Sequence, residues 1–163
     1  MTEGRIVVRY QRECAALPEV VFALLRDSST YPSWSSIGGY EMEEPGVPEP
    51  HGVGELRGFT FGPVRVRERI VELVPNRMMA YTLLSGLPMR DYRGETTLEP
   101  TASGGTRIAW QSSFRGVAGT GWFMRLFMRW TLFNLTTALA RAAEAHSSPI
   151  AALQKNSLAG SHS

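Results

Sequence analysis

The chain has 163 residues but a single cysteine, Cys14, and only three histidines, His51, His146 and His162. One cysteine cannot form a disulfide within the chain, and such low usage is typical of a reducing compartment such as the cytoplasm. The histidines lack the spacing of zinc ligands, and no glycine-rich phosphate loop is present. We therefore expect neither a metal nor a cofactor, and we interpret Cys14 as an inert, buried thiol.

Lysine is almost absent, because sixteen of the seventeen basic residues are arginine. Arginine does not titrate in the accessible range, so a pI of about 9.0 is compatible with a net charge of only +2. The arginines are spread among fifteen acidic residues, which argues against nucleic-acid binding. Arg65, Arg67 and Arg69 share one strand face, where we expect them to pair with glutamates across the sheet.

Long uninterrupted hydrophobic runs are also missing. The most apolar stretch, from Trp122 to Leu139, is broken by Arg125 and Arg129, which argues against stable membrane insertion. The N-terminus has no signal-peptide pattern. We therefore expect a cytoplasmic protein.

The N-terminal part alternates apolar and polar residues from Arg5 to Cys14, which predicts a half-buried strand. A helix is expected to begin at Pro18, since proline is favoured in a first turn, and to end near Asp27. Pro32 then begins a second, shorter helical turn, with Trp34 directed inward.

The middle of the chain consists of strand-like runs separated by turn signals of two to six residues. Such short connections predict antiparallel neighbours. In the second run the apolar pattern slips by one residue after Ile70, which predicts a β-bulge and a bent sheet. The runs are Val53–Phe61, Val64–Val74, Met78–Ser85, Arg90–Glu99 and Thr106–Arg115.

The last predicted element is a helix from Gly121 to Glu144 that is apolar nearly all round in its first half. We expect its aromatic stripe (Trp122, Leu126, Trp130, Phe133) to face the sheet, and a second stripe (Met124, Met128, Leu132, Leu135, Leu139) to lie on the far side. Residues 146–163 are rich in serine, alanine and glycine. They predict a disordered tail after a single domain over residues 1–145.

Four stretches resemble the START-like (SRPBCC, helix-grip) superfamily, in its polyketide cyclase/dehydrase and lipid transport branch: Leu17–Phe22, Tyr31–Trp34, Arg67–Glu72 and Gly105–Trp110. The resemblance covers roughly residues 5 to 145. It implies an α+β helix-grip fold, in which a seven-stranded curved antiparallel sheet wraps around a long C-terminal helix. Two short helices would follow the first strand, and Gly39–Glu43 would be the second strand.

A sheet curved around a helix leaves space for a ligand, and aromatic residues fall on many of the predicted inward positions. We expect an apolar cavity between sheet and helix, although any single ring could instead fill the core. The predicted ligand-binding residues are Trp34, Phe59, Phe61, Tyr81, Arg90, Tyr92, Trp110, Phe114, Trp122, Leu126, Trp130, Phe133 and Asn134.

Two of these residues are polar candidates. Arg90 shares a predicted strand face with Tyr92, and its guanidinium could hold a carboxylate, enolate or phenolate of a ligand. The alternative is a surface arginine at a strand edge. Asn134 could donate a hydrogen bond to a ligand carbonyl, or its amide could be satisfied within the helix.

The favoured function is binding of a small hydrophobic, lipid-like or polyketide-like molecule, as a carrier or sensor. No Asp, Glu or His is clearly inward, so the catalytic residues of an enzyme would be unknown. The alternative is a cyclase or dehydratase (aromatase-like), in which Arg90 or Tyr81 polarises a carbonyl. A third hypothesis is a regulatory or toxin-like interaction module, with a homodimer or partner protein contacting the C-terminal helix at Met124, Met128 and Leu132.

Overall fold

The structure is a computed structural model that describes the backbone of residues 4–159 and the side chains of residues 4–147. It contains seven strands, three α-helices and one 3₁₀ turn. In chain order these are β1 (Arg5–Cys14), α1 (Pro18–Arg26), η1 (Ser28–Thr30), α2 (Tyr31–Trp34), β2 (Gly39–Glu44), β3 (Leu56–Phe61), β4 (Val64–Val74), β5 (Met78–Ser85), β6 (Met89–Pro100), β7 (Thr106–Gly116) and α3 (Gly121–Ala159).

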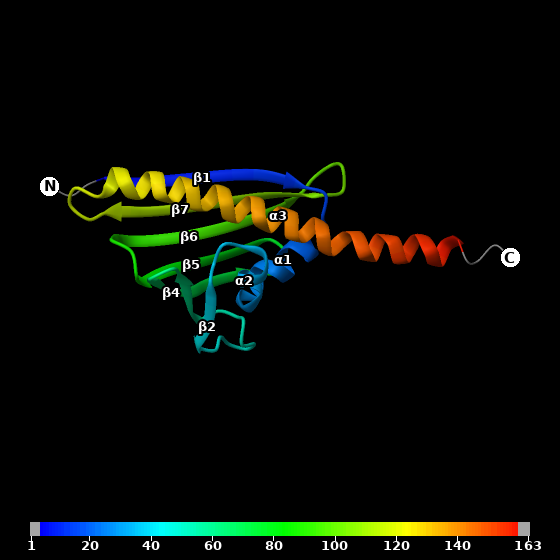
Figure 1. Cartoon of the computed structure of the whole chain (residues 1–163), viewed down its shortest axis with the longest axis horizontal. Coiled ribbons are helices and arrows are strands. Elements are labelled where there is room, and N and C mark those ends of the chain that lie inside the picture. The colour runs from blue at the N-terminus through cyan, green and yellow to red at the C-terminus, as the bar shows by residue number, and fades with distance from the viewer. Residues whose placement is uncertain (1–3, 160–163) are drawn as a thin grey trace.

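The seven strands form one antiparallel sheet in the order β1-β7-β6-β5-β4-β3-β2. The helices α1 and α2 carry the chain from one edge of this sheet to the other, so β1 and β2 are neighbours in sequence but lie at opposite edges (Figure 1). The predicted architecture is confirmed, including the second strand. One boundary was wrong, because β3 begins at Leu56 and the preceding Val53 instead forms an isolated bridge with Val47.

Irregular pairing bends the sheet where the sequence predicted it. Ile70 pairs with Tyr81 and Glu72 with Ala80, so Val71 is left over as a bulge on β4. The pairing of β6 with β7 shifts in the same way between Arg90 and Arg93. Such bulges increase local twist and bend a strand. The concave side of the bent sheet faces α3 (Figure 1).

The long helix α3 lies along β1 and β7 and also packs against α1. Our prediction of its inward face was wrong. Met124, Met128, Leu132, Leu135 and Leu139 are buried against the sheet. Four side chains of the aromatic stripe, those of Trp122, Leu126, Trp130 and Phe133, are exposed.

The physical reason for this orientation is the floor of the sheet. Rings from the strands, including Trp110 and Phe114, already fill it. The methionine and leucine side chains of α3 pack with those rings in one buried cluster, and methionine in particular adapts to irregular gaps. The buried stripe also continues through Ala140 and Ala143, along the whole length of helix that contacts the fold, whereas the aromatic stripe ends at Phe133.

The helix α3 continues past residue 145 to Ala159, into the stretch for which the sequence predicts a disordered tail. Residues 160–163 of that expected tail lie outside the described residues. None of the helices in the described part of the chain is long and apolar enough to cross a membrane.

Candidate functional site

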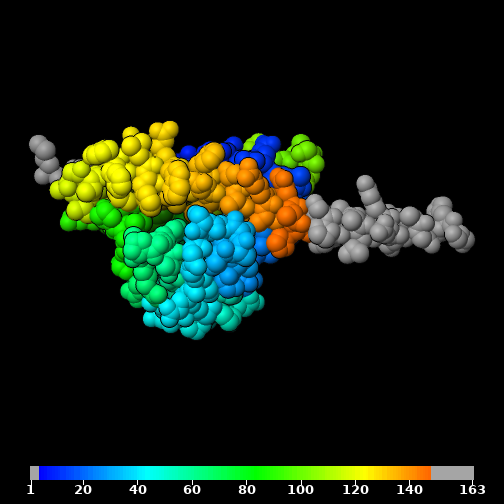
Figure 2. Space-filling view, in the orientation of Figure 1, coloured from blue at the N-terminus to red at the C-terminus, as the bar shows by residue number. Residues whose placement is uncertain are grey.

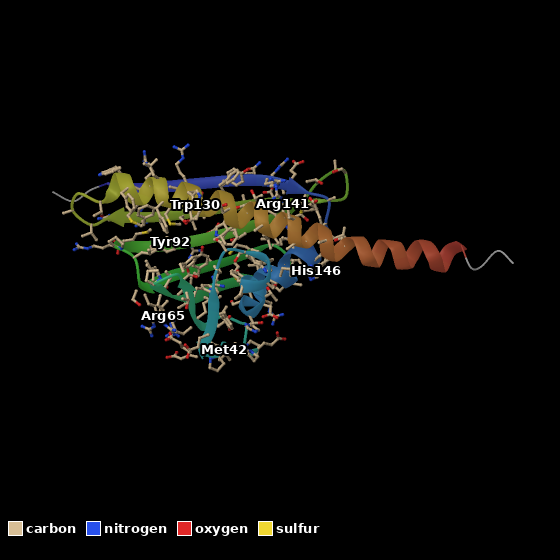
Figure 3. The ribbon with its side chains drawn as sticks, viewed as in Figure 1. Met42, Arg65, Tyr92, Trp130, Arg141 and His146 are labelled. Carbon is tan, nitrogen blue, oxygen red and sulfur yellow. The ribbon has the colours of Figure 1, made fainter. Side chains whose placement is uncertain are left out.

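A cavity of about 570 Å³ lies between the concave face of the sheet and the N-terminal half of α3. Small-molecule sites typically have volumes of about 300–1,000 Å³ and walls that are mainly apolar. Strands β3 to β7 supply one wall, Tyr31 and Ile37 close one side, and α3 supplies the other wall with residues between Phe123 and Leu135. Figure 3 shows Tyr92 on the sheet and Trp130 on the helix across from it.

The structure brings seven of the thirteen sequence-predicted residues to the cavity wall. Six of them are aromatic, and the seventh is the amide residue on α3. The side-chain Nδ2 of Asn134 donates a hydrogen bond to the backbone oxygen of Trp130 at 2.7 Å, as in the alternative interpretation of a locally satisfied amide. The seven are Phe59, Phe61, Tyr81, Tyr92, Trp110, Trp130 and Asn134.

Five other predicted residues lie away from the cavity wall. Trp34 is half-buried beside Tyr31, and its indole Nε1 donates to Thr30 Oγ1 at 2.9 Å. Phe114 is fully buried in the floor of the sheet. Trp122, Leu126 and Phe133 lie on the outer side of α3, for the reason given above.

Arg90 is the sixth predicted residue outside the cavity wall, and its side chain is exposed. The next residue, Asp91, has a positive φ of 49°, and the pairing of β6 shifts beyond it. This irregularity breaks the alternation that would have placed Arg90 and Tyr92 on the same face. The structure therefore supports the alternative interpretation, a surface arginine near a strand end.

The polar centre of the cavity is an ion pair that the sequence analysis missed. Arg57 on β3 lies directly opposite Glu68 on β4, and both line the cavity. Arg57 is 1% exposed. Its Nε and Nη2 both donate to Glu68 Oε2, at 3.1 and 2.9 Å, and its Nη1 donates to Ser28 Oγ at 2.9 Å.

Aromatic rings surround the Arg57 guanidinium. Its carbon Cζ lies 4.9 Å from the ring centroid of Tyr81, 5.0 Å from that of Phe59 and 5.4 Å from that of Tyr31. Cations are attracted to the faces of such rings. Burial by itself would lower the pKa of Arg57, but Tyr31, Glu68 and Tyr81 outweigh it and raise the pKa. The arginine therefore stays charged inside the fold.

The carboxyl group of Glu68 keeps one oxygen available to the cavity. Both bonds from Arg57 go to Oε2, and Oε1 accepts no hydrogen bond from any described residue. Burial raises the pKa of Glu68, while the attraction and hydrogen bonds of Arg57 act in the opposite direction. The prediction that no acidic residue points inward was therefore wrong.

Two tyrosine hydroxyls lie near this pair. Trp110 Nε1 donates to Tyr81 Oη at 3.0 Å, and Tyr92 Oη shares a hydrogen bond of 2.8 Å with Ser112 Oγ. Burial raises the pKa of Tyr92 to about 12 and that of Tyr81 well above its usual value. Both phenols are therefore neutral at physiological pH and act as hydrogen-bonding groups.

A sequence signal for the pair did exist. Arg57 alternates in phase with the inward-facing Phe59, and Glu68 alternates in phase with Val66 and Ile70. Opposite charges at inward positions of adjacent strands favour a cross-strand pair. The outward arginines of β4 alternate with these inward positions, so both faces of this strand carry charged residues.

The outward arginines behave as predicted. Arg65 pairs with Glu41 and Glu43, Arg67 with Glu43, and Arg69 with Glu44. Figure 3 shows Arg65 among these carboxylates, away from α3.

Cys14 is buried as expected, and this burial raises the pKa of its thiol. Within the described residues no group of three or more His, Cys, Asp or Glu side chains is arranged to hold a metal ion.

Comparison with solved structures shows the same fold in proteins of low sequence identity. A START superfamily protein from Mycobacterium smegmatis is 16% identical, with a TM-score of 0.74, over 87% of this chain and 99% of that chain. A norcoclaurine synthase from Thalictrum flavum, solved with a transition-state analogue, is 14% identical, with a TM-score of 0.73, over 90% and 99%. An uncharacterised protein from Bacillus thuringiensis is 19% identical, with a TM-score of 0.70, over 85% and 98%.

The sequence comparisons agree with the fold. No curated protein matches the chain. A family model described as polyketide cyclase / dehydrase and lipid transport matches residues 5–146, which span β1 to β7 and the part of α3 that covers the sheet. The chain therefore belongs to the polyketide cyclase / dehydrase and lipid transport family and has the helix-grip fold of the START-like superfamily.

Proposed function

We propose that this protein binds a small hydrophobic molecule, as a cytoplasmic carrier or sensor, in the cavity between the sheet and α3. The observation that carries the proposal is the cavity itself, which is largely apolar and has a single buried ion pair, Arg57–Glu68, in its wall. Binding such a molecule would remove apolar surface from water on both sides, at about 25 cal/mol per Å².

The ligand class follows from which polar atom is available. The Arg57 guanidinium is already bonded to Glu68 and Ser28 and enclosed by rings, so it is a poor site for an anion. The available atom is Glu68 Oε1, a carboxylate oxygen that accepts hydrogen bonds. The proposed ligand is therefore an apolar molecule that carries a hydrogen-bond donor, such as an alcohol or phenol, rather than a carboxylate.

The test is displacement of a bound hydrophobic fluorescent probe by matched compounds. 1-Dodecanol and dodecanoate share one chain length and differ in their head group. We expect 1-dodecanol to displace the probe more effectively than dodecanoate at neutral pH. In the Glu68→Gln variant, we expect a smaller difference in displacement between the two compounds. Equal displacement by both compounds, or a stronger effect of the acid, contradicts the proposed ligand class.

Blocking the cavity tests the location of binding. Val64 and Val71 lie on the same strand and are each 38% exposed, but only Val64 lines the cavity. We expect Val64→Trp to weaken probe binding strongly and Val71→Trp to leave it unchanged. Equal binding by both variants would place the probe elsewhere on the protein.

The pocket-facing Glu68 also favours a second candidate function, an enzyme of the cyclase or dehydratase type. A carboxyl group whose pKa is raised by burial is suited to acid–base chemistry. The test is mass spectrometry of small-molecule extracts incubated with the protein. A product formed by the wild type and not by Glu68→Gln supports catalysis, whereas bound but unchanged molecules support the carrier or sensor role.

A further inference from the structure

The outer side of α3 is unusual in what it exposes to solvent. Trp122 is 70% exposed and Trp130 60%, and Phe123, Leu126 and Phe133 are each about half exposed. Every exposed aromatic side chain among the described residues belongs to this one helix. A contiguous apolar surface of this kind marks an interaction site. In Figure 2 this part of α3, in yellow, forms the outer ridge of the molecule.

The charge around this aromatic face has one sign. Arg125 and Arg129 are exposed on the same half of the helix and form no ion pair with any described residue. The sequence contains no Asp or Glu between Glu99 and Glu144, whereas five arginines fall within that stretch. Three acidic residues, Glu41, Glu43 and Glu44, lie instead on β2, where they pair with arginines of β4.

We propose that the outer face of α3, formed by Trp122, Phe123, Leu126, Trp130 and Phe133 with Arg125 and Arg129, binds the surface of an anionic lipid bilayer. A helix that combines Trp, Phe and Leu with arginine on its polar flank is suited to lie in the membrane interface. Tryptophan is favoured at the depth of the lipid head groups. The arginines meet the negative charge of the head groups, each contributing to the affinity.

A second copy of the chain fits this face less well. In a two-fold symmetric interface the same patch meets itself, so Arg125 and Arg129 would face a patch that carries the same two arginines. The acid-free stretch that contains α3's first half offers no carboxylate to neutralise them. An anionic membrane satisfies both the apolar and the cationic part of the surface.

This surface lies next to the cavity, which gives membrane binding a functional consequence. Phe123 and Trp130 belong to the exposed face and also line the cavity, so the two features meet on one flank of α3. Docking would bring the cavity beside the hydrocarbon region, from which a hydrophobic molecule could enter without crossing water. The membrane contact itself does not depend on the proposed ligand, and it is tested without one.

The experiment is co-sedimentation of the full chain with vesicles of phosphatidylcholine alone or mixed equally with phosphatidylglycerol. We expect binding to the anionic vesicles, a blue shift of tryptophan emission and weaker binding as salt is raised. Arg125→Glu with Arg129→Glu should weaken partition by about tenfold or more. Trp122→Ser with Trp130→Ser should abolish the blue shift.

Matched controls lie elsewhere on the surface. Leu84→Ser removes an exposed apolar side chain from β5, and Arg77→Glu reverses an exposed charge at the β4–β5 turn. Both should bind vesicles like the wild type. The proposal is overturned if the helix variants bind as well as these controls. It is equally overturned if the wild type does not bind anionic vesicles and instead forms dimers. Such dimers would dissociate in the variant that combines Trp122→Ser with Trp130→Ser.

Discussion

Arg57 and Glu68 lie directly opposite each other on β3 and β4, and two guanidinium nitrogens of Arg57 donate to one oxygen of Glu68. The arginine is enclosed by Tyr31, Phe59 and Tyr81, so it has no access to water with which to replace its partner. The pair is therefore part of the core as well as of the cavity wall. Because of this double role, we expect the pair to affect the free energy of unfolding differently from the surface ion pairs on the same sheet.

Removing one member should be far more costly than removing both. Arg57→Met leaves the Glu68 carboxylate buried without its partner, and we expect a loss of about 3–5 kcal/mol of unfolding free energy. Adding Glu68→Leu should restore much of that loss, because the uncompensated charge disappears. Urea denaturation of the single and double variants measures the coupling.

The control for this cycle is Arg93, which pairs with Glu72 and Glu95 at the surface. Exposed pairs contribute about 0–1 kcal/mol, so Arg93→Met should change the denaturation midpoint little. Equal losses from Arg57→Met and Arg93→Met would show that Arg57 is solvated rather than enclosed.

A second prediction concerns the orientation of α3. Leu132 is fully buried against the sheet, whereas Trp130, two residues earlier, is mostly exposed. Leu132→Ala should cost about 2–5 kcal/mol by opening a cavity. Trp130→Ala should cost about 1 kcal/mol or less despite the larger side chain, as is usual for surface positions. The reverse ranking in urea denaturation would mean that the helix is rotated in solution.

The contrast between Leu132 and Trp130 also shows what sequence patterns can and cannot predict here. Strand runs, turn signals and the bulge after Ile70 are local, and the sheet follows them closely. The helix offers two apolar stripes, and periodicity alone cannot choose between them because both have the same spacing. The choice depends on which side chains fit the floor of the sheet, which is a property of packing between distant segments.

The candidate site also contains some residues that sequence patterns predict and others that they do not. The aromatic cavity residues follow from strand alternation, since Phe59, Phe61 and Tyr81 lie at inward positions. Arg90 was misplaced because the irregularity at Asp91 is invisible in a pattern of apolar and polar residues. Arg57 and Glu68 are eleven residues apart in the chain, so the pair follows only from the register between β3 and β4.

Gly94 provides a third prediction, on how the cavity wall is shaped. It pairs with Tyr81 on the adjacent strand, and a Cβ atom at this position would overlap the Tyr81 ring. Gly94→Ala should therefore displace the ring, cost about 1–3 kcal/mol and weaken probe binding, since Tyr81 is part of the wall. Gly58 is the matched control, because a Cβ there meets only the flexible end of Arg65. If the two alanine variants have equal stability and equal probe affinity, the close approach of Gly94 to Tyr81 is wrong.

The last prediction concerns alkaline pH. Burial raises the pKa of Tyr31 and of Tyr92 to about 12, whereas in the unfolded chain both phenols titrate near 10. Below pH 10 both states are protonated, so these groups add no pH dependence. Between pH 10 and 12 the unfolded chain releases protons that the folded protein retains, and stability is lost as pH rises. Each tyrosine should account for a loss of about 2–3 kcal/mol in the free energy of unfolding over this window.

Urea denaturation at a series of pH values measures this loss. Tyr92→Phe should flatten the curve by its own share, because it keeps the ring and removes the ionisable hydroxyl. A Tyr92→Phe curve as steep as that of the wild type would mean that the Tyr92 hydroxyl ionises freely in the fold and is not enclosed by the cavity floor.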